Sequence, residues 1–330
     1  MKTQSDYSLE TEDLRRVYET TRGIFRKTQV KREALKGINL QVKQGELFGL
    51  LGPNGAGKTT FIKILSTMLL PTSGRAFVAG YDVVRQTEQV RKCIGVVLGG
   101  ERGLYYRLTA RENMEHWAAL YRVPRDVAPQ RITRLLEMVG LHDRADDRVE
   151  VFSRGLKQRL HIARGLLSAP PVIFLDEPTI GLDPVAARDL RALVGNLKSE
   201  GITILLTTHQ MHEAETMCDR VAFIKEGEIV SLDTPRALTR AIESIQLLKV
   251  EFDVGAQTPS AQLEEMAGVH EVQMSTNAEG FSLQIKAEKD AIPHILQVLS
   301  QTDVQQINSR EPSLEDVYIQ LLGMKGQKHD

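Results

Sequence analysis

The sequence predicts an α/β domain with a mainly parallel sheet around a phosphate-binding loop, followed by a small α+β domain. Three observations support this prediction. A glycine-rich loop, 52–59, joins an apolar strand to a helix, and a second apolar strand, 171–175, ends in two acids. After about residue 240 the pattern changes to alternating strands. We therefore expect a nucleotide-binding domain over residues 1–240 and an accessory domain over residues 241–330.

The loop between the strand 46–51 and the helix 60–65 matches the pattern G-x-x-x-x-G-K-[ST]. Its residues, with the next one, are Gly52, Pro53, Asn54, Gly55, Ala56, Gly57, Lys58, Thr59 and Thr60. Glycines let the backbone N–H groups turn toward phosphate oxygens, Lys58 reaches the β- and γ-phosphates, and Thr59 offers a hydroxyl to Mg²⁺. The alternative is a glycine-rich turn that matches by chance. The flanking strand and helix favour a site for a nucleotide triphosphate, and we call residues 52–59 the P-loop.

The second apolar strand is followed by Asp176 and Glu177. Its uninterrupted β-branched character is typical of a strand buried on both faces of a parallel sheet. Asp176 at the strand end can hold the water shell of Mg²⁺, and Glu177 can point at the γ-phosphate and polarise an attacking water. The alternative is that the two acids merely cap a loop. A strand-terminal Asp in a chain with a P-loop favours the catalytic interpretation.

The segment 152–160, Phe-Ser-Arg-Gly-Leu-Lys-Gln-Arg-Leu, resembles a subgroup of the signature sequence of the ATP-binding cassette family. Apolar residues on one helix face place Ser153 at the N-cap, where the helix dipole makes a second anion site. The resemblance implies a P-loop NTPase cassette with a mainly parallel sheet, an antiparallel β subdomain and a helical insert. It also implies that Ser153, Arg154 and Gly155 close on the ATP held by a second copy of the chain.

Further motifs of the family follow in order. Gly181-Leu182-Asp183 resembles the loop that crosses the dimer interface, with Asp183 as its polar contact. His209 follows the apolar strand 202–208, where the family places a switch histidine that senses the γ-phosphate. A histidine at a strand end is more often a satisfied structural residue. The agreement of motif order with fold context favours the sensor.

Two positions depart from the family pattern. Tyr18 resembles the aromatic that stacks on adenine, but the stretch 19–33 after it is longer than usual, basic, and offers Phe25 as a rival. The alternative for Tyr18 is packing within a small sheet. After the strand 94–98 no glutamine stands where the family supplies one; Gly99-Gly100-Glu101 is found instead. Either Glu101 supplies an oxygen, or the glycines form a hinge whose backbone and waters do so.

Residues from about 104 to 165 are predicted to form the helical insert, beginning with a capping box from Thr109 to Glu112. In the family, the groove between this insert and the core receives a short helix of the membrane-spanning partner. Four residues are candidates to line that groove, although aromatics at this spacing are more often core: Leu104, Tyr105, Tyr106 and Trp117.

The accessory domain is predicted from a short helix after Thr234, three alternating strands and one helix. The strands are expected at 247–254, 271–275 and 281–287, and the helix at 291–302. Near the end, 311–318 resembles a pattern common in the drug- and polysaccharide-export branch of the family. Its acids contact a partner, or they cap a terminal helix that starts at Ser313 with Asp316 in its first turn.

Composition excludes some classes of function. The chain has 330 residues, a net charge of −1 and a pI of about 6.7, which gives no reason to expect a nucleic-acid partner. Its two cysteines, Cys93 and Cys218, are too few for a disulfide framework or a zinc site and favour a reducing cytoplasm. No apolar run approaches the roughly 18 residues of a spanning helix, so we expect membrane contact only through a partner.

The resemblance therefore implies the ATP-hydrolysing subunit of an exporter. Two copies would sandwich two ATP molecules, and a separate permease would hold the dimer at the cytoplasmic face of the cell membrane. The alternative is a regulatory or non-transport cassette with slow or no hydrolysis, because of the missing glutamine. A ribosome-acting cassette ATPase would normally carry two cassettes in one chain, whereas this sequence has one P-loop. A chromosome-maintenance ATPase would separate its motifs by long heptad coils, for which the 95 residues between Lys58 and Ser153 leave no room.

Overall fold

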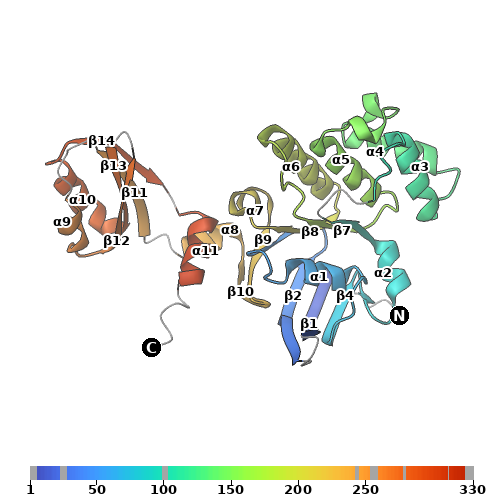
Figure 1. Ribbon diagram of the computed structural model, residues 1–330, viewed down its shortest axis with the longest axis horizontal. Coiled ribbons are helices and arrows are strands. Elements are labelled where there is room, and N and C mark those ends of the chain that lie inside the picture. Colours follow the sequence, from blue (N-terminus) through green and yellow to red (C-terminus); the bar gives the residue numbers. More distant parts are fainter. Residues whose placement is uncertain are drawn as a thin grey trace. The chain divides into compact units, whose positions relative to one another are not determined.

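The computed structural model describes residues 6–22, 28–98, 103–241, 245–252, 259–277, 280–310 and 312–323. The chain divides between Thr234 and Pro235 into two compact units, and each is described by itself (Figure 1).

The first unit contains a six-stranded sheet of order β10-β9-β3-β8-β7-β6, parallel except for the antiparallel pair β9 and β10. Every residue of β3, β7 and β8 is buried, as expected for apolar strands covered on both faces. Because these three neighbours are parallel, their carboxyl ends meet at one edge of the sheet. The strands are β3 Leu47–Leu51, β6 Ile94–Val97, β7 Val172–Asp176, β8 Thr203–Thr208, β9 Arg220–Lys225 and β10 Glu228–Asp233.

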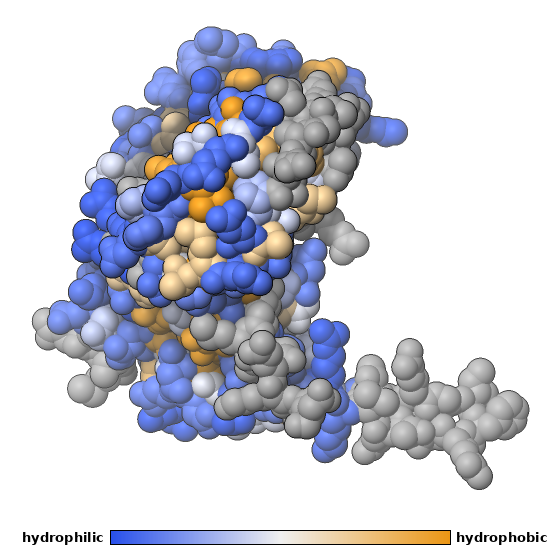
Figure 2. Space-filling model, turned by 90° about the vertical axis from the view of Figure 1, so that its left-hand side faces the viewer, coloured by the Kyte–Doolittle hydropathy of each residue, from blue (hydrophilic) through white to orange (hydrophobic). Residues whose placement is uncertain are grey.

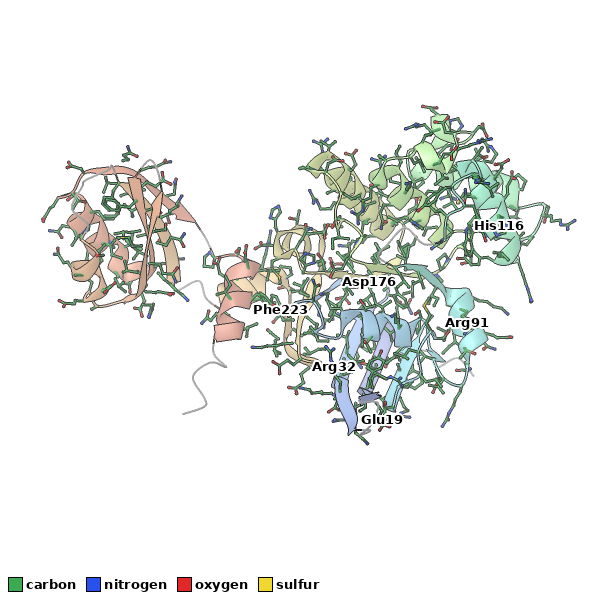
Figure 3. All side chains as sticks on the ribbon, viewed as in Figure 1. Glu19, Arg32, Arg91, His116, Asp176 and Phe223 are labelled. Carbon is green, nitrogen blue, oxygen red and sulfur yellow. The ribbon has the colours of Figure 1, made fainter. Side chains whose placement is uncertain are left out.

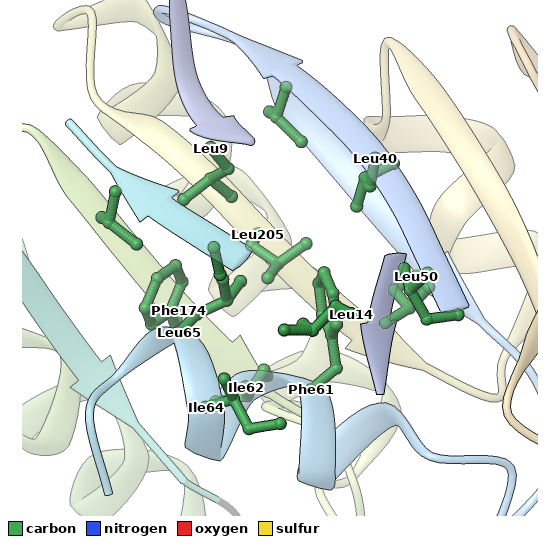
Figure 4. Packing of buried hydrophobic residues seen from close by; sticks show 14 of the residues in the cluster. Leu9, Leu14, Leu40, Leu50, Phe61, Ile62, Ile64, Leu65, Phe174 and Leu205 are labelled. Atoms are coloured by element: carbon green, nitrogen blue, oxygen red, sulfur yellow. The ribbon is translucent and has the colours of Figure 1, made fainter. Parts of the chain in front are cut away.

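A second, antiparallel sheet of the same unit has the order β2-β1-β4-β5. Its strands are β1 Tyr7–Arg22, β2 Thr28–Lys43, β4 Ser73–Val78 and β5 Tyr81–Asp82. Helix α1, Lys58–Leu65, packs its apolar face into a core with both sheets, where Phe61 and Leu65 lie among Leu14 of β1, Phe174 of β7 and Leu205 of β8 (Figure 4). Burial of these side chains fixes the start of α1 beside the sheet edge.

Helices complete the first unit. The helical insert contains α3, α4 and α5, and its predicted capping box is confirmed: Thr109 Oγ1 accepts from Glu112 N, and Glu112 Oε2 accepts from Thr109 N. Helices α6 and α7 follow β7 and β8 along the chain. The bounds are α2 Thr87–Cys93, α3 Ala110–Leu120, α4 Ala128–Met138, α5 Arg154–Gly165, α6 Pro184–Ser199 and α7 Met211–Met217.

The second unit contains an antiparallel sheet of order β12-β13-β11-β14, with α9 and α10 on one face (Figure 1). Residues of β11, β13 and α10 share its apolar core, including Phe252, Leu283 and Ile295. The predicted strands and helix are present, but the sequence analysis missed α9 and β14. The elements are α8 Pro235–Arg240, β11 Ile245–Phe252, α9 Ser260–Glu264, β12 Val269–Asn277, β13 Gly280–Glu288, α10 Ile292–Leu299, β14 Val304–Arg310 and α11 Leu314–Gly323.

The start of α11 follows the capping interpretation of the sequence. Asp316 Oδ2 accepts hydrogen bonds of 2.8 Å from both the backbone N and the hydroxyl of Ser313. These two bonds hold the carboxylate in the first turn of the helix, where it also complements the helix dipole.

The surface and the cysteines agree with the composition. On the face shown in Figure 2 hydrophilic residues predominate, with smaller hydrophobic patches between them. No helix in the described part of the chain is long and apolar enough to cross a membrane. Cys218 is buried and Cys93 half-buried, and burial raises the pKa of the Cys218 thiol.

Candidate nucleotide site

A cavity of about 480 Å³ opens between the P-loop and the antiparallel sheet. Tyr18 of β1, Arg32 and Ala34 of β2, and Glu177 after β7 form part of its wall. The remaining lining comes from the P-loop and the residue after it: Pro53, Asn54, Gly55, Gly57, Lys58, Thr59 and Thr60. The structure therefore brings together most residues that the sequence analysis assigned to a nucleotide. Gly52 and Ala56 are buried behind this surface.

The glycines of the P-loop are required by geometry. Gly57 has φ of 117°, and a Cβ there would lie 2.7 Å from the carbonyl oxygen of Ala34. A Cβ on Gly52 would overlap the carbonyl oxygen of Ile224 in β9. Side chains at either position would push the loop away from its neighbouring strands.

The N-terminus of α1 faces this loop without a side-chain cap. Gly57 is its N-cap and has no side chain that could accept from the first-turn N–H groups. Helices α5 and α6, by contrast, are capped by Ser153 and Asp183. Uncapped amide donors at the positive end of a helix dipole suit an anion, and phosphate is the anion for which this loop pattern is built.

Lys58 is buried under the loop. Its Nζ donates to the carbonyl oxygens of Gly52 at 2.6 Å and Pro53 at 3.2 Å, and it lies 3.2 Å from Oε1 of Glu177. The side chains of Lys58 and Glu177 are only 5% and 16% exposed. Within one chain, therefore, the lysine charge is matched by the acid predicted to act on water.

Asp176 is held by two threonine hydroxyls. Thr59 Oγ1 donates to Asp176 Oδ2 at 3.0 Å, and Thr207 Oγ1 donates to Oδ1. The second contact follows from register, because Asp176 is the β-partner of Thr207 across β7 and β8. The sequence analysis missed Thr207, whose strand pattern does not distinguish it from its neighbours. Hard hydroxyl and carboxylate oxygens side by side fit Mg²⁺, which takes few protein ligands and retains several waters.

Glu177 and His209 form the third contact. His209 Nδ1 lies 2.7 Å from Glu177 Oε2, and since an ionised carboxylate can only accept, Nδ1 carries the proton in this contact. Glu177 has φ of 49°, a left-handed conformation that is uncommon for a residue with a side chain. Its backbone N donates to Thr207 O at 3.0 Å, which holds this strained turn against β8.

The signature residues do not line the cavity of their own chain. Ser153 and Arg154 are exposed at the start of α5, and Ser153 Oγ accepts from Leu156 N at 3.4 Å, as predicted for an N-cap. Gly155 is buried against α6, where an added Cβ would lie 2.9 Å from Cβ of Ala186.

Asp183 has a role within the chain that the sequence analysis did not predict. Its Oδ1 accepts from Val185 N at 3.0 Å and Ala186 N at 2.9 Å, so the carboxylate is the N-cap of α6. A contact across a dimer interface remains compatible with this cap, because the side chain is exposed and Oδ2 has further lone pairs.

Glu213 was missed altogether. It lies on α7, is 2% exposed, and accepts at Oε2 from Thr179 Oγ1 at 3.0 Å. Burial raises the pKa of this carboxyl, and the hydrogen bond from Thr179 opposes the shift. Thr179 lies between Glu177 and Asp183 in the chain, and α7 begins after His209, so Glu213 joins the two loops.

The structure places Tyr18 at the cavity wall, half-buried, with its hydroxyl 3.5 Å from Thr60 Oγ1. The guanidinium of Arg16 lies over the Tyr18 ring. The rival Phe25 and the segment Gly99-Gly100-Glu101 lie outside the described residues.

The four groove candidates of the insert differ from one another. Leu104 is buried, whereas Tyr105 and Tyr106 are 48% and 37% exposed. Trp117 is half-buried: its Nε1 donates to Gly103 O at 2.9 Å, and the guanidinium of Arg164 lies over its ring. Two of the aromatics thus present open surface, as the docking interpretation requires.

Comparison with protein families gives two matches that divide the chain. Residues 35–180 match the ABC transporter family, and residues 243–322 match the C-terminal domain of DrrA1-3-like ATP-binding proteins.

Related proteins agree over nearly the whole chain. A linearmycin resistance ATP-binding protein of Bacillus subtilis is 33% identical, over 91% of this chain and 96% of its own. A daunorubicin resistance ATP-binding protein of Streptomyces coeruleorubidus is 33% identical over 88% and 92%. A fluoroquinolones export ATP-binding protein of Mycobacterium tuberculosis is 36% identical over 91% of each.

Solved structures match the first unit. A dimeric ATP-binding cassette in a post-hydrolysis state with ADP and Pi has a TM-score of 0.60 and 27% identity, over 68% of this chain and 98% of its own. An ABC transporter subunit of Clostridium perfringens has a TM-score of 0.61 and 29% identity, over 72% and 95%.

Proposed function

Because the chain belongs to the ABC transporter family, as one of its ATP-binding subunits, we propose that it powers export through a separate membrane permease. These matches confirm three predictions made from the sequence: the family, the cassette fold class and the ATPase activity. One observation carries the proposed mechanism: Lys58, Asp176, Glu177 and His209 converge beside the uncapped start of α1.

In this proposal the P-loop amides and Lys58 bind the phosphates of ATP. Lys58 leaves Glu177 to do so, which frees the carboxylate to orient a water molecule. His209 holds the other oxygen of Glu177 and responds to the γ-phosphate. Thr59 and Asp176 are the oxygen ligands that would hold Mg²⁺, whose chemistry there is to neutralise phosphate charge.

The active site is proposed to be completed by a second copy of the chain. Ser153, Arg154 and Gly155 begin α5 and do not line the cavity of their own chain, and Ser153 and Arg154 are exposed there. A related cassette was solved as a dimer with ADP and Pi. We infer that two copies sandwich two ATP molecules, and that Asp183 contacts the partner beside them.

The permease is proposed to dock at the insert. Tyr105 and Tyr106 give exposed aromatic surface beside the buried Leu104 and the half-buried Trp117. Such docking would place the chain at the cytoplasmic face of the cell membrane. The names of the relatives favour drug-like compounds as cargo, recognised by the permease.

The second candidate is a regulatory cassette with slow or no hydrolysis, favoured only by the absence of a glutamine after Leu98. Two measurements decide between them: ATP hydrolysis by the purified chain, and co-purification of a membrane protein with it. We expect Mg²⁺-dependent hydrolysis that Lys58→Ala abolishes.

The exposed Lys63 on the same helix is the matched control, and Lys63→Ala should hydrolyse ATP normally. If the wild-type chain binds ATP but does not turn it over, even with its membrane partner, the regulatory function replaces the export function.

A further inference from the structure

The β1–β2 hairpin beside the nucleotide cavity has two differently charged faces. Across the hairpin, Glu19 is the β-partner of Lys31, and Tyr18 is the β-partner of Arg32. Successive side chains of a strand point to opposite faces, so Lys31 and Arg32 are directed apart. Figure 3 labels Glu19 and Arg32 on this hairpin and Asp176 at the end of β7.

The outer face is neutralised by its own ion pairs. Lys31 Nζ lies 2.9 Å from Glu19 Oε1, and Arg15 Nη1 lies 3.3 Å from Glu33 Oε1. Lys31 and Arg15 therefore have carboxylate partners within the sheet.

Arg32 differs from them. Among the residues that the structure describes, no carboxylate lies within ion-pair distance of its guanidinium. Its Nη2 donates to the carbonyl oxygen of Gly55 in the P-loop at 3.4 Å. The side chain lines the same cavity as Tyr18, Lys58 and Glu177.

The charge of the cavity wall is therefore unbalanced. Lys58 is matched by Glu177, whereas no described carboxylate compensates the Arg32 guanidinium that lines the same cavity. A guanidinium presents several donors in a planar fork that matches phosphate oxygens. A guanidinium beside a phosphate-binding loop therefore favours contact with the phosphates of a nucleotide over contact with its neutral base.

We propose that Arg32 binds the phosphate chain of ATP from the hairpin, across the cavity from Lys58, while Tyr18 next to it covers the base. This inference rests on the proposed nucleotide site and adds a residue that none of the recognised motifs contains. It also gives a function to part of the long basic stretch after Tyr18, which departs from the family pattern.

The test measures equilibrium binding to the full-length chain by competition with a fluorescent ATP analogue. Arg32→Ala should weaken ATP about tenfold, the usual scale of one partly exposed charge-assisted contact, and Arg32→Lys should recover part of the loss. Lys31→Ala is the matched control, because it removes the same charge from the adjacent position on the other face. It should change ATP affinity less than about twofold.

Inorganic tripolyphosphate, which has no base, separates the two parts of the ligand. Arg32→Ala should weaken tripolyphosphate by the same factor as ATP, whereas Tyr18→Ala should weaken ATP alone. The loss in Arg32→Ala should shrink at high salt, because added ions screen the contact between the guanidinium and the phosphates.

Three results would overturn the inference: unchanged ATP affinity in Arg32→Ala, an equal loss in Lys31→Ala, or a loss for ATP without one for tripolyphosphate. Thermal melting of each variant checks its fold. If the wild-type chain itself fails to bind ATP, the proposed nucleotide site is wrong. If wild type and Arg32→Ala bind ATP equally well, the nucleotide site stands and only the role of Arg32 is wrong.

Discussion

Replacing Glu177 by glutamine tests the proposed chemistry most directly. The variant keeps the size of the side chain but removes its charge and its capacity to accept a proton from water. We expect kcat to fall by about 10² or more, the scale of losing a positioned general base. We expect ATP affinity to stay the same or to improve.

The contacts of the carboxylate set both expectations. Glu177 accepts from His209 Nδ1 at 2.7 Å through one oxygen and faces Lys58 Nζ at 3.2 Å through the other. An amide has only one oxygen, so one of these two donors then faces an NH₂ group, at a cost of about 1 kcal/mol to the folded state. The fall in kcat corresponds to a loss of about 2.7 kcal/mol of transition-state stabilisation. This loss is larger than the cost of about 1 kcal/mol from the altered hydrogen bond. Lys58, released from its ion pair, is then available to phosphate without competition.

The assay combines single-turnover hydrolysis with equilibrium ATP binding on the same preparation. Glu200→Gln, at the exposed end of α6, is the control for loss of one negative charge and should match wild type in both measurements. Hydrolysis by Glu177→Gln within about threefold of wild type would refute the assignment of the base. A fall in ATP affinity that parallels the fall in kcat would refute the proposed competition between Glu177 and phosphate for Lys58.

Two further predictions concern stability and are read by thermal melting. Gly52→Ala should lower the Tm by about 4–10 °C, because its Cβ overlaps a carbonyl oxygen of β9. The control is Gly195→Ala within α6, where the added Cβ has no neighbouring atom within 4 Å, and this variant should keep the Tm of wild type. An equal fall in Tm for both variants would contradict the steric argument. Burial raises the pKa of Glu213, so stability is lost as the pH rises from the unfolded-state pKa toward the folded-state pKa. Glu213→Gln should therefore raise the Tm more at about pH 7.5 than at about pH 5. The control is Glu215→Gln at a half-buried position of the same helix, which should shift the Tm equally at both pH values. A rise in Tm for Glu213→Gln that is larger at about pH 5 would refute the argument.

Features with a local cause were predicted from the sequence. Each signal lies within a few residues of the chain: a motif for the P-loop, and an apolar run for the strands before Asp176 and before His209. The caps at Thr109 and Ser313 likewise depend on side chains three positions apart. Each of these requires only the geometry of one strand end or one helical turn.

Features that depend on pairing between distant segments were not predicted. Thr207 reaches Asp176 only through the register of β7 and β8, and Glu213 reaches Thr179 only through the packing of α7. The edge strand β14 has a weak apolar pattern, Val-Gln-Gln-Ile-Asn-Ser-Arg, because one face of its sheet is polar. The left-handed backbone of Glu177 is also nonlocal in origin, since its N–H is held by β8.

The contacts of a single chain fit the proposal that two copies complete the site. On the P-loop side, Lys58 meets Glu177 and Asp176 meets two hydroxyls, so the groups of the proposed chemistry hold one another. On the signature side, the exposed Ser153 caps its own helix and does not border the cavity. We propose that the donors of the second chain satisfy phosphate oxygens that those of the first chain leave open. The free capacity to bind anions is thus divided between two surfaces of the same chain, and a symmetric pair of chains is the simplest assembly that brings each P-loop against a signature helix.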